Sequence, residues 1–182
     1  MTRTFPTEKA VHRRLRRSFF VDKRGATAVE FALIAPAFIA LLVGIIQTFL
    51  AFFASQLLEQ VVISSSRVIL TNQAQSQNMT QSQFNQLVCS KVVILLTCSG
   101  LMIDVQAYNG FGGVNTSAPT LTYNAGKVSN AWQYNPGLPG QIVVVRLMYE
   151  WPVFGGPLGF TLSNLADGNR LIMASSAFQN EP

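Results

Sequence analysis

The sequence predicts an α+β fold: a long N-terminal transmembrane helix continuing as an amphipathic rod, a short second helix, and a small antiparallel sheet of about three strands. Three observations support this prediction. Residues 31–53 form an apolar run of 23 residues without a charge. Residues 55–70 keep apolar side chains at helical spacing. Later segments alternate apolar and polar residues, which is typical of half-buried strands.

The basic residues gather before the apolar run. Residues 1–25 hold eight of the 13 lysines and arginines and two of the eight acids, so this segment carries +6 and the remainder −1. Lysine and arginine mark the cytoplasmic flank of a membrane span and can also contact anionic lipid headgroups. We therefore expect a basic cytoplasmic leader over residues 1–25, a transmembrane helix over 26–54, and an extracytoplasmic α+β domain over 55–182. Charge confined to one flank also argues against nucleic-acid binding.

The apolar run has the length of a retained anchor. At about 1.5 Å per residue, 23 residues cross a hydrocarbon core of roughly 30 Å. A secretory signal has an apolar region of about 7–15 residues that ends at small side chains. This run instead closes with Ala51-Phe52-Phe53-Ala54-Ser55, which places phenylalanine where small residues are needed. We expect one span and no second.

Beyond the anchor, the pattern predicts a rod, a short helix and strands. Apolar residues on one helical face extend the first helix to about Leu70, and a polar tract follows over residues 71–83. Thr80 is the expected N-cap of a second helix that reaches Lys91. The run Val92–Leu96 is compatible with either helix or strand. Strands are expected over residues 101–108, 141–151 and 171–178.

Residues 109–140 are rich in Gly, Asn, Ser, Thr and Pro, and we expect a long exposed loop. Aromatic residues punctuate it. They either pin the loop to its own sheet or form a contact surface for a partner. The residues concerned are Tyr108, Phe111, Tyr123, Trp132 and Tyr134.

Cys89 and Cys98 are the only cysteines, and both lie on the outer side in this topology. Two thiols in an oxidising compartment suggest one disulfide that closes a short loop. Their spacing excludes a CxxC redox pair, and two cysteines without a nearby histidine make a poor zinc site. A buried pair of free thiols is the alternative.

Catalysis has little support in the sequence. The single histidine, His12, lies in the leader, and no phosphate-binding loop, nucleophile elbow or HExxH motif occurs. Acids after the leader are scattered, and we expect all but Glu30 to be solvated or at strand edges. These residues are Glu30, Glu59, Asp104, Glu150, Asp167 and Glu181. We expect no enzyme and no cofactor.

Glu30 stands out because ionisable groups next to a membrane span are costly and usually functional. It is the fifth residue after Gly25, which ends the basic flank. The run Arg-Gly-Ala-Thr-Ala-Val-Glu-Phe-Ala-Leu-Ile-Ala-Pro (residues 24–36) resembles the processing site of type IV prepilins. It is still more similar to the TadE-like minor pseudopilins of tight-adherence (Flp) pilus systems. The close resemblance covers Lys23 to about Phe53.

The resemblance implies a structural protein of adhesion-pilus assembly. A prepilin peptidase would cleave between Gly25 and Ala26, and other pilins or pseudopilins would be partners. The protein would sit in the bacterial inner membrane, with its N-terminus cytoplasmic and its C-terminal domain periplasmic. Its length exceeds that of the small major Flp pilins, which favours a minor component at the base or tip of a pilus.

Cleavage would give Ala26 a positive amine, and Glu30 lies four residues later on the same helix face. The carboxylate can therefore meet its own amine or that of an adjacent subunit. The alternative is an uncleaved, signal-anchored extracytoplasmic binding module. In that case Gly25 merely ends the basic flank, and Glu30 reaches the membrane interface without a partner.

Overall fold

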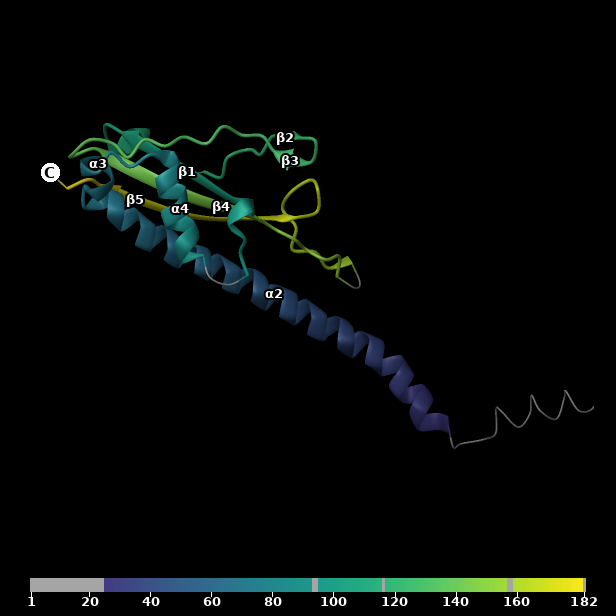
Figure 1. The fold of residues 1–182 in the computed structure, drawn as a ribbon. Coiled ribbons are helices and arrows are strands. Elements are labelled where there is room, and N and C mark those ends of the chain that lie inside the picture. The colour runs from purple at the N-terminus through teal and green to yellow at the C-terminus, as the bar shows by residue number, and fades with distance from the viewer. Residues whose placement is uncertain (1–24, 93–94, 116, 157–158, 182) are drawn as a thin grey trace, which may run out of the picture. The chain divides into compact units, whose positions relative to one another are not determined.

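The computed structural model describes residues 25–92, 95–115, 117–156 and 159–181 (Figure 1). The predicted leader up to residue 24, with His12, lies outside the described residues. The chain divides into two compact units, Met1–Gly44 and Ile45–Pro182.

The long predicted helix is confirmed. Helix α2 runs over Ala26–Leu70, 45 residues, with Pro36 inside it. Its buried residues all lie beyond position 50, at spacings of three, four or one, and so form one helix face. They are Ala51, Ala54, Leu58, Val61, Val62, Ser65, Ser66 and Ile69. The amphipathic character predicted for the outer part of the helix is therefore real.

Two shorter helices follow, α3 at Gln73–Ser76 and α4 at Gln81–Lys91. Thr80 caps α4 as predicted, through a capping box. The Thr80 side chain accepts the Gln83 backbone N–H at 3.3 Å, and the Gln83 side chain accepts the Thr80 N–H at 2.8 Å. At the other end, Lys91 Nζ donates to the Ser64 carbonyl at 2.7 Å. Helix α4 is thereby tied to α2.

The predicted three-stranded antiparallel sheet is present, in the order β1-β4-β5. Strand β1 covers Leu101–Tyr108, β4 covers Ile142–Trp151 and β5 covers Arg170–Gln179. In β1 and β4, Tyr108 pairs with Ile142 and Leu101 with Tyr149. The apolar residues of one face, such as Val105, Val143 and Leu147, join the buried face of α2 in a single core.

The C-terminus closes the end of the unit near Leu70. The backbone N–H of Glu181 donates to the Leu70 carbonyl at 3.1 Å, which satisfies one group at the end of α2. Asn180 is buried, and its side chain donates to the Pro136 and Leu138 carbonyls at 2.9 and 3.2 Å. Three distant parts of the sequence therefore meet at this end.

The prediction that residues 109–140 form only an exposed loop is partly wrong. They contain a small hairpin of β2 (Tyr123–Asn124) and β3 (Lys127–Val128). Ala125 and Gly126 between them both have positive φ, 50° and 76°, as type I′ hairpin turns require. The segment also runs over the sheet face opposite α2 (Figure 1).

The run Val92–Leu96 is compatible with either helix or strand from the sequence. At the positions that the structure describes, it forms neither. Helix α4 ends at Lys91, and Val92, Leu95 and Leu96 lie outside helices and strands. Leu95 adopts a left-handed φ of 67° and Leu96 is buried. The chain turns sharply here before it enters β1.

The prediction that Asp104 is a solvated or strand-edge acid is wrong. Only 4% of the residue is exposed, and its carboxylate forms an ion pair with Arg146. The two residues lie directly opposite one another in the pairing of β1 and β4. Burial of the acid is tolerated because a cation from the neighbouring strand compensates its charge.

Candidate functional site

The first candidate site is the beginning of α2, where Gly25, Ala26 and Glu30 lie together and are all exposed. A Cβ placed on Gly25 meets no described atom within 4 Å, and the residue has no left-handed φ. Neither packing nor backbone geometry within the described chain therefore requires glycine at this position.

Glu30 is the only acid between Gly25 and Leu58, and it makes no hydrogen bond or ion pair with the described residues. It lies one helical turn after Ala26, so the two project from the same side of α2. Its charge is therefore available to a partner.

The helix beyond Glu30 is apolar on all sides. Phe31 and Leu33 are 73% and 75% exposed, and none of the most apolar 18-residue window is buried. A helix of this kind, with a mean hydropathy of 2.5, needs lipid or other apolar helices around it. It is the one helix among the described residues long and apolar enough to cross a membrane, which is compatible with a single-pass anchor.

The second predicted feature, the disulfide, is present. Cys89 and Cys98 are bonded, with Cα atoms 5.4 Å apart. The bond joins the last turn of α4 to the short 3-10 turn Cys98–Gly100 that precedes β1. Beside it, the hydroxyls of Thr97 and Tyr149 lie 3.2 Å apart. The disulfide thus fixes α4 to the start of the sheet, in the unit that does not contain Glu30.

A buried ion pair is the feature that sequence reasoning missed. Arg146 Nη2 lies 2.9 Å from Asp104 Oδ2, and both side chains are about 5% exposed. Asp104 also accepts hydrogen bonds from the Gln133 backbone N–H at 3.0 Å and the Gln106 side chain at 2.9 Å. Arg146 Nη1 reaches the Ser117 carbonyl at 3.4 Å. The pair therefore attaches the segment 109–140 to the sheet.

Two of the loop aromatics have the first predicted role, in which they pin the loop to the rest of the unit. Tyr134 packs on Phe84 with ring centroids 5.3 Å apart, and burial raises the pKa of its phenol. Tyr123 donates to a Glu150 carboxylate oxygen, and this hydrogen bond is the main cause that raises the pKa of Tyr123 to about 12. These two residues pin the loop. Phe111, in contrast, is 66% exposed.

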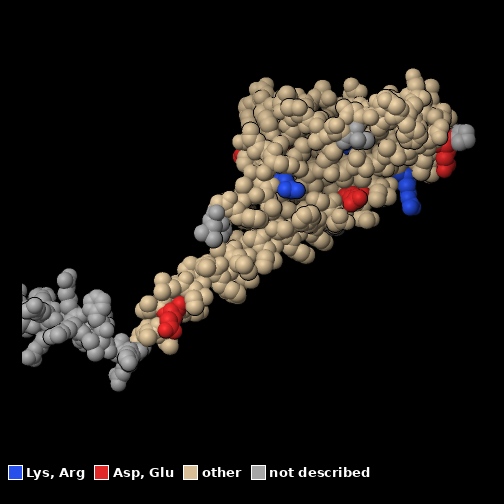
Figure 2. Space-filling view, turned by 180° about the vertical axis from the view of Figure 1, so that it is seen from behind, with Lys and Arg blue, Asp and Glu red and all other residues tan. Residues whose placement is uncertain are grey.

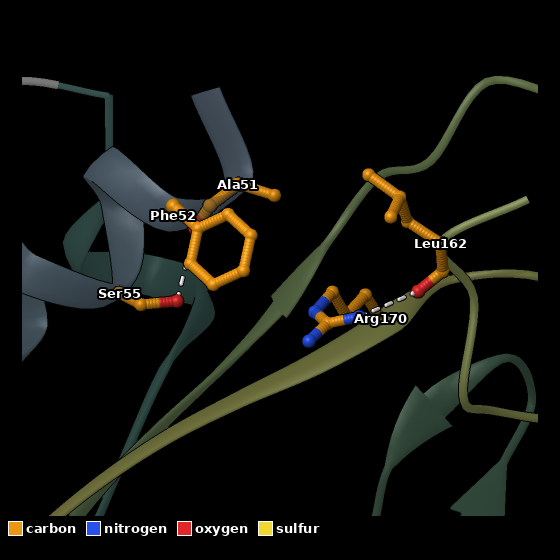
Figure 3. Close-up of a pocket in the computed structure, with 5 residues that line it drawn as sticks. All are labelled: Ala51, Phe52, Ser55, Leu162 and Arg170. Atoms are coloured by element: carbon orange, nitrogen blue, oxygen red, sulfur yellow. Dashed lines mark hydrogen bonds between the residues drawn. The ribbon is translucent and has the colours of Figure 1, made fainter. Parts of the chain in front are cut away.

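Two shallow hollows lie where the loop after β4 meets α2. One is lined by Ala51, Phe52, Ser55, Leu162 and Arg170, and Arg170 Nη1 donates to the Leu162 carbonyl at 3.0 Å (Figure 3). The other is lined by Gln47, Leu50, Trp151, Pro152, Val153, Phe154 and Leu162. Neither gathers the acids, bases or nucleophiles that a catalytic site needs. Among the described residues, no cluster of three or more His, Cys, Asp or Glu could hold a metal ion.

Comparison with known proteins places the similarity at the amino-terminal site. Residues 25–67 match the family model described as TadE-like protein. The matched segment begins at Gly25, includes Glu30 and ends three residues before the end of α2. The chain matches no curated protein and no solved structure at a significant level.

Proposed function

We propose that this chain, which the match over residues 25–67 identifies as a TadE-like protein connected with the tight-adherence pilus system, is a minor pseudopilin. In this role it is structural, anchored by one span and matured by a prepilin peptidase. It contributes to the assembly of an adhesion pilus, with its outer domain packing on partners or capping the structure. The observation that carries the proposal is an exposed Glu30, one turn after Ala26 and without a partner among the described residues, on an uncovered apolar helix inside the family match.

The proposed orientation follows from charge and redox chemistry. The +6 flank of residues 1–25 favours a cytoplasmic amino terminus, which puts the Cys89–Cys98 disulfide on the periplasmic side of the inner membrane. Disulfides persist in the periplasm and are rare in the cytosol. The disulfide therefore supports this orientation independently of the basic flank.

Peptidase maturation is tested at Gly25. A tryptophan here has open space around it among the described residues, so Gly25→Trp should block cleavage without disturbing the fold. Gly110→Trp is the matched control, because a Cβ at Gly110 also meets no described atom within 4 Å and the residue lies far from the motif. Mass measurement of membrane-extracted protein from cells with the peptidase should give a chain that starts at Ala26 for the control only. A mature Gly25→Trp chain would refute cleavage at this bond.

Assembly is tested at Glu30. By the proposal, its carboxylate meets the Ala26 amine of the same or a neighbouring subunit, which lowers the cost of a charge near hydrocarbon. Glu30→Gln should then leave insertion and cleavage intact but sharply reduce piliation and co-purification with other pilins. Glu59→Gln removes an exposed carboxylate from the same helix and should not. Normal pilus yield in a cleaved Glu30→Gln strain would favour the alternative of a plain anchored binding module.

A further inference from the structure

The loop after β4 exposes apolar side chains beside the anchor helix. Phe154 is 74% exposed and Phe160 is 43% exposed, and both lie outside helices and strands. We call residues 151–156 and 159–162 the apolar loop. No charged residue occurs anywhere from position 151 to 166. Contiguous exposed apolar surface of this kind marks an interaction site.

Residues of the apolar loop and of the uncharged stretch of α2 line the same two hollows. Trp151 and Phe154 line one hollow with Gln47 and Leu50, and Leu162 lines the other with Phe52. The helix has no charged residue between Glu30 and Glu59, which leaves 28 uncharged positions. The loop therefore lies beside the part of the helix that precedes its next charge, Glu59.

The length of α2 gives the depth in the membrane at which the two hollows lie. A hydrocarbon core of roughly 30 Å takes about 20 helical residues, so a core that begins at Phe31 ends near Leu50. The whole uncharged stretch, at about 1.5 Å per residue, is about 42 Å long, which equals a bilayer with its headgroup regions. Residues 47–52, which line the two hollows with the loop, thus lie at the outer boundary between hydrocarbon and headgroups.

We infer that the apolar loop inserts into the outer headgroup region of the membrane that the helix spans, with Phe154, Phe160 and Trp151 as its interfacial side chains. Aromatic residues favour this boundary, and the absence of charge removes the main cost of entering it. Helix α2 also exposes the apolar side chains of Phe49 and Phe52 in the same stretch. Charged side chains are sparse on the face shown in Figure 2. The inference depends on the proposed single-span anchoring, but not on cleavage or pilus assembly.

The opposite end of the sheet supplies a matched control. Phe111 follows Tyr108, which pairs with Ile142 at the far end of β4 from Trp151. It is 66% exposed, almost as much as Phe154. If the apolar loop lies at the membrane, Phe111 must lie well away from it.

The test uses the full chain in vesicles of phosphatidylcholine and phosphatidylglycerol, with and without lipid brominated near the headgroup. Trp132 and Trp151 are replaced by phenylalanine, and one new tryptophan is introduced as Phe154→Trp or as Phe111→Trp. The Phe154→Trp indole should emit at shorter wavelength and lose the larger part of its emission to brominated lipid. The Phe111→Trp indole should lose little. Thermal unfolding checks that both variants keep the wild-type fold.

Three results would overturn the inference. Quenching of the Phe154→Trp indole as weak as that of the Phe111→Trp indole would place the apolar loop in water. A blue-shifted Phe154→Trp emission without quenching would mean that the loop is covered by another subunit rather than by lipid. Failure of either variant to float with the vesicles would refute the single-span anchoring itself. The first two results, obtained with variants that float normally, would refute only the role of the loop.

Discussion

Arg146→Met tests whether the buried ion pair fastens the segment 109–140 to the sheet. The substitution keeps most of the apolar stem of Arg146 but leaves Asp104 without its cation, in a position that is 4% exposed. Asp104 would still accept hydrogen bonds from Gln133 and Gln106. The variant therefore removes the buried positive charge together with the hydrogen bond that Arg146 donates to the Ser117 carbonyl.

The expected cost is large for one residue. Breaking a buried pair by removing one partner costs about 3–5 kcal/mol, and the remaining hydrogen bonds to Asp104 place this case near the lower value. An exposed pair would contribute only about 0–1 kcal/mol. For a domain of this size, about 3 kcal/mol corresponds to a fall of roughly 10 °C in Tm.

The assay is denaturant and thermal unfolding of the full chain in detergent, followed by near-ultraviolet circular dichroism of the outer domain. Lys127→Met removes an exposed lysine from β3 and should change stability by less than about 0.5 kcal/mol. Adding Asp104→Asn to Arg146→Met should restore part of the loss, because the uncompensated charge disappears. An Arg146→Met variant within about 1 kcal/mol of wild type would refute the reasoning.

Three further predictions concern the same unit. Reduction or Cys89→Ser should lower the stability of the outer domain by about 2–3 kcal/mol, as expected for a closed loop of about ten residues; thiol labelling of Cys89 and Cys98 in native material would contradict the disulfide. Ultraviolet titration should find the Tyr123 phenol with a pKa of about 12, and Glu150→Ala should return it toward 10.0. Because folding raises this pKa, the stabilisation by this hydrogen bond is present below pH 10 and is lost as pH rises through about 12. Leu58→Ala should cost about 2–5 kcal/mol in unfolding experiments, because Leu58 is fully buried where α2 packs on the sheet.

Local signals in the sequence were sufficient for most elements. The apolar run and the spacing after it predict α2, and Thr80 with Gln83 predicts the start of α4, because caps depend on residues three positions apart. The three strands follow from alternation, and the structure has them at nearly the expected positions. The TadE-like segment is also contiguous in sequence, so the resemblance could be read from residues 24–36 alone.

What sequence reasoning missed depends on contacts between distant residues. Asp104 looks like an ordinary strand acid until strand pairing places Arg146 opposite it and the segment 109–140 covers both. The β2–β3 hairpin was hidden because Ala125, a non-glycine residue, takes one of its two left-handed positions. The position of the apolar loop could not be predicted either, since only the fold shows that it lines a hollow together with Leu50 of α2.

The closure of the outer unit by Asn180 and Glu181 has a consequence for biosynthesis. Strands β4 and β5 leave the ribosome after the other described helices and strands, and the hydrogen bond from the Glu181 N–H to the Leu70 carbonyl can form only after both. Until then the apolar face of α2, which includes Leu58, Val62 and Ile69, has no sheet to cover it. Contacts of such long sequence separation form slowly. The nascent chain must therefore carry an uncovered apolar helix face until β5 has left the ribosome, and its outer unit can be completed only after that point.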